Sequence, residues 1–215
     1  MTVSLALNFR IHCPGQVPVV TSRHVSSHGY ESTRRRLNGK QADTVSKLTE
    51  AAVVVLREHE YSGLTVRAVA AEAGVGAATA YTYFSSKEHL VAEVFWRRLR
   101  AFPSSDGTGS DPTARVLAVL RNIALLLADE PQVSAAVTNA LLGTDPEVEH
   151  LRDRIGFEIH SRLVAAMDPV VNPHRIEAIE MLYAGALLRA GMGYGTYEYI
   201  AGRLEASARL ILEHP

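Results

Sequence analysis

The chain has 215 residues, with 22 Lys and Arg against 23 Asp and Glu, which gives a formal net charge of −1 at pH 7. This balance excludes a general polyanion binder, so any charge that binds nucleic acid must be local or doubled by dimerisation. The length allows a sizeable core in one or two domains, and no apolar run approaches the roughly 20 residues that span a bilayer. The single cysteine, Cys13, leaves no disulfide framework. We therefore expect a soluble cytoplasmic protein with no membrane segment.

Residues 1–38 contain proline, glycine and serine residues that break any periodicity. Basic residues outnumber acids there, and Arg34, Arg35 and Arg36 are adjacent. The composition predicts a disordered basic N-terminal arm. Two interpretations remain open. The arm tracks phosphates or enters a minor groove, or it is a solvated tail, which includes the case of an upstream start codon that the cell does not use.

A helix is predicted over residues 41–60, followed by two short helices with a tight turn between them. Thr65 is a suitable N-cap for the first short helix, and Gly74 follows its last periodic residue, where a left-handed conformation is usual. The second short helix is predicted from about Gly76 to Phe84. Its outward residues would be Ala77, Ala78, Thr79, Tyr81 and Thr82.

Two helices around a glycine-containing turn describe a helix-turn-helix, whose second helix lies in the DNA major groove. The spacing alone equally fits a short helical hairpin buried in an all-helical core.

Helix-start signals recur through the rest of the chain. Ser85 with Glu88 suggests a capping box that opens a helix to about Phe102. Asp-Pro or Asn-Pro pairs then precede three apolar stretches. The predicted helices cover residues 112–129, 131–142, 146–167, 173–192 and 196–212, and no strand signal appears.

From about residue 47 to residue 95 the chain resembles the N-terminal DNA-binding domain of the TetR family of bacterial transcriptional regulators. The residues that carry this resemblance are Leu64–Ala70, Ala73–Val75, Thr79–Phe84, Ser86–Glu88 and Leu90. The resemblance implies an all-α fold with an N-terminal helix-turn-helix domain and a C-terminal helical domain for ligand binding and dimerisation. We place these at residues 39–102 and 112–215, with a linker at 103–111.

The resemblance also assigns DNA-binding residues. Thr79 and Tyr81 are candidates for base edges, and Phe84 and Val75 are read as core. Phosphate contacts, which position a protein without specifying sequence, are expected from Thr65, Arg67, Tyr83 and Lys87. The family often has Ser at Gly76, a basic residue at Ala77 and Arg or Lys at Thr82, so this recognition helix is less basic than usual. The full candidate set is Thr65, Arg67, Ala77, Thr79, Tyr81, Thr82, Tyr83 and Lys87.

The expected function is a ligand-responsive repressor that binds an inverted-repeat DNA operator as a homodimer and is released by a small hydrophobic or amphipathic effector. By resemblance, the last two helices form the dimer; small residues there would otherwise only pack within the subunit. The alternative is a helical protein-interaction or ligand-carrier module that has lost DNA binding. Candidate pocket residues, which are otherwise simply core, are Leu120, Ile123, Leu127, Val137, Leu141, Phe157 and Leu187.

No pattern indicates an enzyme. The glycine-rich stretch at residues 191–195 follows a helix rather than a strand, so it is not a dinucleotide-binding motif. The nine histidines show no zinc-site spacing. We predict no cofactor and no metal site.

Overall fold

The computed structural model describes residues 39–103, 111–167 and 172–213. Over these ranges the chain is all-α, as predicted, and contains no strand. The basic arm, with Cys13 and Arg34–Arg36, and most of the linker lie outside the described residues. The helices are α1 (Gly39–Glu58), α2 (Val66–Glu72), α3 (Ala77–Tyr83), α4 (Lys87–Ala101), α5 (Pro112–Ala124), α6 (Pro131–Leu141), α7 (Pro146–Ala166), α8 (Pro173–Gly191) and α9 (Tyr197–Glu213).

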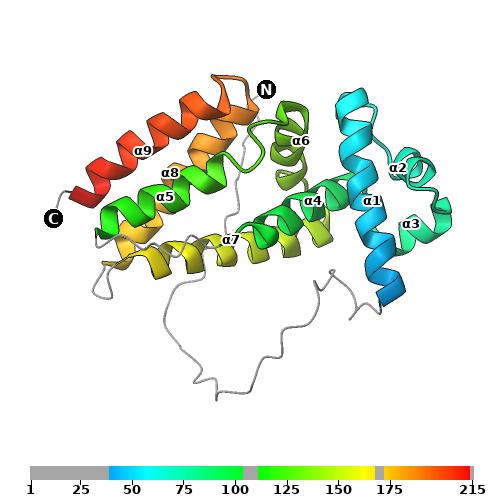
Figure 1. The fold of residues 1–215 in the computed structure, drawn as a ribbon, viewed down its shortest axis with the longest axis horizontal. Coiled ribbons are helices and arrows are strands. Elements are labelled where there is room, and N and C mark those ends of the chain that lie inside the picture. The colour runs from blue at the N-terminus through cyan, green and yellow to red at the C-terminus, as the bar shows by residue number, and fades with distance from the viewer. Residues whose placement is uncertain (1–38, 104–110, 168–171, 214–215) are drawn as a thin grey trace, which may run out of the picture.

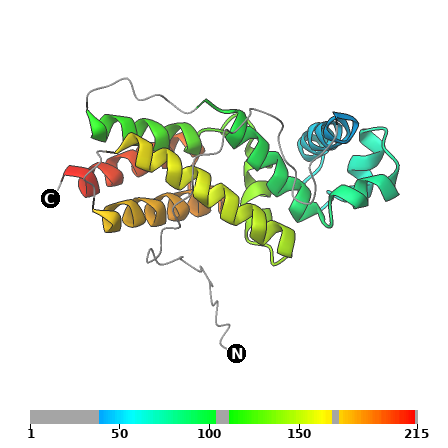
Figure 2. The ribbon, with the colours of Figure 1, turned by 90° about the horizontal axis from the view of Figure 1, so that it is seen from below.

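The helices form an elongated molecule with α1, α2 and α3 at one end and α5, α8 and α9 at the other (Figure 1). Helix α4 runs from the first group into the middle of the molecule, which is also visible in the perpendicular view of Figure 2. It packs against α1 on one side and against α6 and α7 on the other. Most of its residues are therefore buried, and the two predicted domains share this helix.

Several predicted helix starts are confirmed. The Thr65 side chain accepts a hydrogen bond from the Ala68 amide, and Asp111 accepts from the amides of Thr113 and Ala114. Helices α5, α6, α7 and α8 all begin with a proline, whose missing N–H would be unpaired at that position in any case.

The helix predicted over residues 112–129 ends earlier, at Ala124. The chain then tightens into turns in which amides bond to carbonyls three residues back, as from Glu130 to Leu127. Pro131 ends these turns in their last residue, because a residue before proline is pushed out of the helical region. Glu130 accordingly has φ −131° and ψ 69°. Apolar periodicity alone concealed this break.

The predicted capping box at Ser85 is displaced by one residue. Ser86 is the N-cap of α4, and its Oγ accepts from the His89 amide at 3.0 Å. Ser85 instead donates to a carboxylate of another helix, which is described below. None of the helices in the described ranges combines the length and the apolar character needed to cross a membrane.

Candidate DNA-binding site and its connection to the second domain

The turn between α2 and α3 has the geometry that its sequence predicts. Val66, Val69 and Ala70 on α2 are buried in the core. Gly74 then has φ +63°, a left-handed conformation that glycine adopts without steric cost. The Val75 amide closes the turn by donating to the Ala70 carbonyl at 2.9 Å. The turn thus sets α3 against α2 at the end of the molecule.

Two buried residues fix the orientation of α3. Ala80 and Phe84, four residues apart, are both 0% exposed. Their side chains define the inward face of the helix, because positions i and i+4 lie on one side. The exposed residues on the opposite face are Ala78, Thr79, Tyr81 and Thr82. This face includes both of the candidates for base contacts, Thr79 and Tyr81.

The other two candidates on α3 lie at the edges of the exposed face. Ala77 and Tyr83 are half-buried, and Tyr83 packs against the core. On α2, Arg67 is exposed, as is the capping residue Thr65. All of these candidates are therefore at least partly accessible, and the exposed face of α3 carries small and hydroxyl-bearing side chains.

Lys87 is held by the connection between α1 and α2. Its Nζ donates to the Tyr61 carbonyl at 3.0 Å and lies 4.3 Å from the centroid of the Tyr61 ring. The Tyr61 hydroxyl donates to Glu88 at 3.0 Å. Burial, together with the nearby Glu88 carboxylate, raises the pKa of Tyr61. Lys87 thus fastens the start of α4 to the segment between α1 and α2, and a phosphate contact from it would share the ammonium group with Tyr61.

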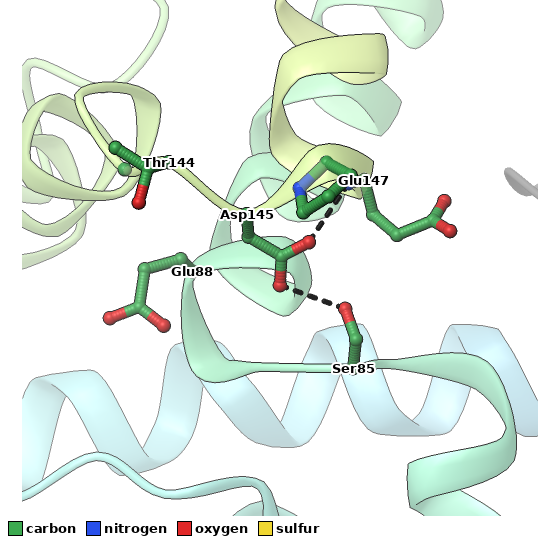
Figure 3. Close-up of a pocket in the computed structure, with 7 residues that line it drawn as sticks. Ser85, Glu88, Thr144, Asp145 and Glu147 are labelled. Atoms are coloured by element: carbon green, nitrogen blue, oxygen red, sulfur yellow. Dashed lines mark hydrogen bonds between the residues drawn. The ribbon is translucent and has the colours of Figure 1, made fainter.

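A carboxylate joins the start of α4 to the start of α7. Asp145 caps α7, with Oδ1 accepting from the Glu147 amide at 2.8 Å. Its Oδ2 accepts from Ser85 at 2.9 Å and from Ser86 at 2.5 Å. Ser85, Asp145 and Glu147 border a surface pocket of about 580 Å³, in which Glu88 lies beside Asp145 (Figure 3). Partial burial raises the pKa of Asp145, but the hydrogen bonds from Ser86, the Glu147 amide and Ser85 outweigh it and hold that pKa below its ordinary value.

Two further carboxylates bind α4 to the second domain. Glu130, at the start of α6, accepts from Arg98 of α4 and from Arg57 of α1. Glu158 of α7 accepts from Arg100 of α4 and from Arg162. Although partial burial opposes it, these hydrogen bonds and charges lower the pKa of both glutamates.

The buried Arg162 completes this contact. Its guanidinium donates to the carbonyls of Leu99 and Phe102, at the end of α4. Carbonyls at a helix end lack partners within the helix, so α7 supplies the donors for the last turn of α4. Sequence reasoning missed these connections because each joins residues that are far apart along the chain.

Six of the seven predicted pocket residues lie in the core of the second domain. Leu120, Ile123, Leu127 and Val137 are buried, whereas Leu141 and Leu187 are half-buried and pack against the core. Phe157 is 73% exposed on the outer side of α7, so the prediction that it lines an interior pocket does not fit its position. The inward stripe of α7 is Leu151, Ile155, Ile159 and Leu163, at a spacing of four residues that the sequence also contains.

A buried hydroxyl in this domain was not predicted. Tyr183 of α8 is 6% exposed, and its Oη has no hydrogen-bond partner in the described part of the chain. Burial raises the pKa of this phenol. Within the described ranges, no group of three or more His, Cys, Asp and Glu residues is arranged to hold a metal ion.

The fold and this site together define a helix-turn-helix protein with a second, all-helical domain. Residues 48–94 match the model of the bacterial regulatory proteins of the tetR family. An uncharacterised HTH-type transcriptional regulator of Mycobacterium tuberculosis is 46% identical over 198 residues, which cover 91% of this chain and 92% of the relative. The chain therefore belongs to the TetR family, and it is a transcriptional regulator.

Two other proteins show the range of the similarity. The HTH-type transcriptional repressor KstR of Rhodococcus jostii is 27% identical over 127 residues, 58% of this chain and 59% of KstR. The crystal structure of the transcriptional regulator FadR from Bacillus subtilis in complex with stearoyl-CoA superposes with a TM-score of 0.62 at 16% identity. This superposition covers 78% of this chain and 97% of FadR.

Proposed function

We propose that this protein is a transcriptional repressor that binds an inverted-repeat operator as a two-fold dimer and is released by a small hydrophobic or amphipathic effector. DNA binding is supported chiefly by the orientation of α3 about its own axis. Ala80 and Phe84 anchor its inner side, so Thr79 and Tyr81 stand on its exposed side. In a helix-turn-helix, such a face reaches base edges in the major groove. The relative KstR is a transcriptional repressor, which supports repression as the regulatory effect.

The dimer is supported by exposed apolar and small residues on α8 and α9, which pack side by side. On α8, Met181 is 60% exposed and is followed by exposed Ala184 and Gly185 at helical spacing. On α9, Leu210 is 63% exposed, with exposed Ala206 one turn earlier. A two-fold partner on this face would remove both stripes from water. It would also set two recognition helices one DNA turn apart, roughly 34–36 Å.

An effector site in the second domain is supported by the apolar side chains of α5 and α6 and by Tyr183. Leu120, Ile123 and Val137 are buried there and would supply an apolar lining. The unpaired Tyr183 hydroxyl would meet a polar group of the ligand. FadR, which shares this fold, was crystallised with stearoyl-CoA, a molecule with a long apolar chain and a polar end. An effector that favours a subunit arrangement unsuited to DNA must lower operator affinity, because linkage is reciprocal.

One observation favours a second candidate function, a helical interaction or carrier module without DNA binding. None of the seven side chains of α3 carries a charge. Non-specific attraction to phosphates would then depend on residues outside this helix, such as Arg67. The salt dependence of DNA affinity separates the two functions. Phosphate contacts release counterions, so the DNA affinity of a repressor should fall steeply as the salt concentration rises.

The test uses the full chain and the DNA immediately upstream of its own gene, with a scrambled duplex as the control. We expect selective binding at low salt, two subunits per site, and a marked loss of affinity as salt is raised. Equal, weak binding to both duplexes, with no preferred sequence after selection from random duplexes, would exclude the repressor.

Gly185→Arg should convert the dimer to a monomer in sedimentation experiments, with Gly156→Arg on α7 as the matched control. An intact Gly185→Arg dimer would contradict the proposed interface on α8 and α9.

A further inference from the structure

The exposed face of α3 lacks every side chain that forms paired hydrogen bonds with a base. Its members are Ala78, Thr79, Tyr81 and Thr82. Arginine and lysine pair with guanine, asparagine and glutamine with adenine, and acidic residues with cytosine. None of these residue types occurs in α3. The remaining direct contacts in the major groove are single hydroxyl bonds and apolar contacts with the thymine methyl group.

One of the two threonine hydroxyls on this face is bonded within its own helix. Thr82 Oγ1 donates to the Ala78 carbonyl at 3.1 Å. Thr79 Oγ1 lies near the start of the helix, 3.7 Å from the position of a Cβ built on Gly76. With its hydroxyl bonded this way, Thr82 offers a groove mainly its methyl group, on the same helix face as the methyl group of Ala78. The Tyr81 ring, 54% exposed, borders this surface.

We propose that this recognition helix selects its operator through the 5-methyl groups of thymine, so that the base pairs under Ala78, Thr79 and Thr82 are thymine-containing. The inference rests on the proposed DNA binding and adds the base that is read. The phosphate contacts that give affinity come from outside the face, from residues such as Arg67. Discrimination between bases at this face then comes from the burial of protein methyl groups against thymine methyl groups.

The test compares two versions of one duplex. The duplex is selected from random sequences by the full-length protein and is resynthesised with deoxyuridine for thymidine in each half-site, which removes only the methyl groups. Each contacted methyl should contribute about fourfold in affinity, the equivalent of about 0.8 kcal/mol per buried carbon. Binding to non-specific duplexes should not change on the same replacement.

Matched protein variants locate the contact. Thr82→Ser and Thr79→Ser each remove one methyl group and keep the hydroxyl, so each should reduce the difference between the thymidine and deoxyuridine duplexes. Thr113→Ser, on α5 in the other domain, should leave that difference at the wild-type value. Circular dichroism melting curves would confirm that all three variants are folded.

The outcomes are distinct. Selective, salt-sensitive binding that ignores the loss of the methyl groups would overturn the thymine inference and leave the repressor intact. Selected half-sites with guanine and cytosine at the positions that respond to Thr79 and Thr82 would do the same. A folded protein that selects no duplex would overturn both the repressor and the inference.

Discussion

The hydroxyl of Ser86 lies 2.5 Å from Oδ2 of Asp145, so the N-cap of α4 donates to the N-cap of α7. Each residue also accepts an amide of its own helix, from His89 and from Glu147 respectively. The two helix starts are therefore locked by one chain of hydrogen bonds. Because α3 leads directly into α4 through Phe84 and Ser85, these bonds connect the start of α7 to the segment that follows the recognition helix.

Asp145→Ala should destabilise the protein more than a cap alone explains. Loss of a helix cap costs about 1 kcal/mol. The bonds to Ser85 and Ser86 add to this, and because Asp145 is partly exposed we expect a total of about 2 kcal/mol. Asp111→Ala is the matched control, since Asp111 also caps a helix with proline at its first position and bonds to the amides of Thr113 and Ala114. Equal losses in thermal unfolding would show that the serine bonds contribute nothing.

Acid should weaken the contact between α4 and the second domain. Asp145, Glu130 and Glu158 have pKa values held below their ordinary values of 3.8 for Asp and 4.5 for Glu. A depressed pKa stabilises the folded state above the ordinary value, and this contribution is lost as the pH falls through the folded pKa. The free energy of unfolding should therefore decrease as the pH falls below about 5.

The three neutral variants Asp145→Asn, Glu130→Gln and Glu158→Gln should each flatten this acid slope in urea unfolding measured at a series of pH values. Glu93 acts in the opposite direction, because burial raises its pKa against the effect of Arg97. Protonation of Glu93 on acidification favours the folded state, so Glu93→Gln should steepen the decline. A slope that none of these variants alters would exclude this electrostatic account.

Gly191→Ala should destabilise the packing of α8 on α6. A Cβ built at Gly191 would overlap the Thr138 side chain, whose Cγ2 lies 2.6 Å away. Overpacking of this kind costs about 1–3 kcal/mol. Gly156→Ala on α7 is the control, because nothing lies within 4 Å of its Cβ position and alanine favours a helix by about 1 kcal/mol. The midpoint temperature of thermal unfolding should fall for Gly191→Ala and rise for Gly156→Ala. Shifts in the same direction would contradict the close approach of Gly191 to Thr138.

Local signals predicted most of the fold, because caps and turns depend on neighbouring residues. Thr65, Gly74 and Asp145 each do what their sequence context indicates. The exposed face of α3 followed in the same way from helical periodicity. Long-range contacts carry no such signal. Nothing in the sequence near Ser85 indicates that it donates to a carboxylate 60 residues away.

The prediction for Phe157 was wrong for a different reason. The buried stripe of Leu151, Ile155 and Ile159 was present in the sequence, and its periodicity places Phe157 on the outer side of α7. The assignment relied on residue type in place of periodicity.

Tyr183→Phe should be neutral or stabilising, by up to about 1 kcal/mol, because a buried hydroxyl without a partner has lost its water and gained nothing. Ser134→Ala is the contrasting control. The Ser134 hydroxyl is also buried, but it donates to the Leu127 carbonyl at 2.6 Å, so its removal should cost about 1–3 kcal/mol. Thermal unfolding of the two variants tests this difference, and a loss for Tyr183→Phe as large as that for Ser134→Ala would show that the phenol is bonded.

The same variant bears on the proposed effector. If Tyr183 bonds a polar group of the ligand, Tyr183→Phe should keep full operator affinity while requiring more effector for release. A saturated fatty acyl-CoA and its free fatty acid are suitable probes, since they separate the apolar chain from the polar end. If a probe releases the wild-type protein and the Tyr183→Phe variant from DNA at the same concentration, the polar end of the effector does not bond Tyr183 of α8.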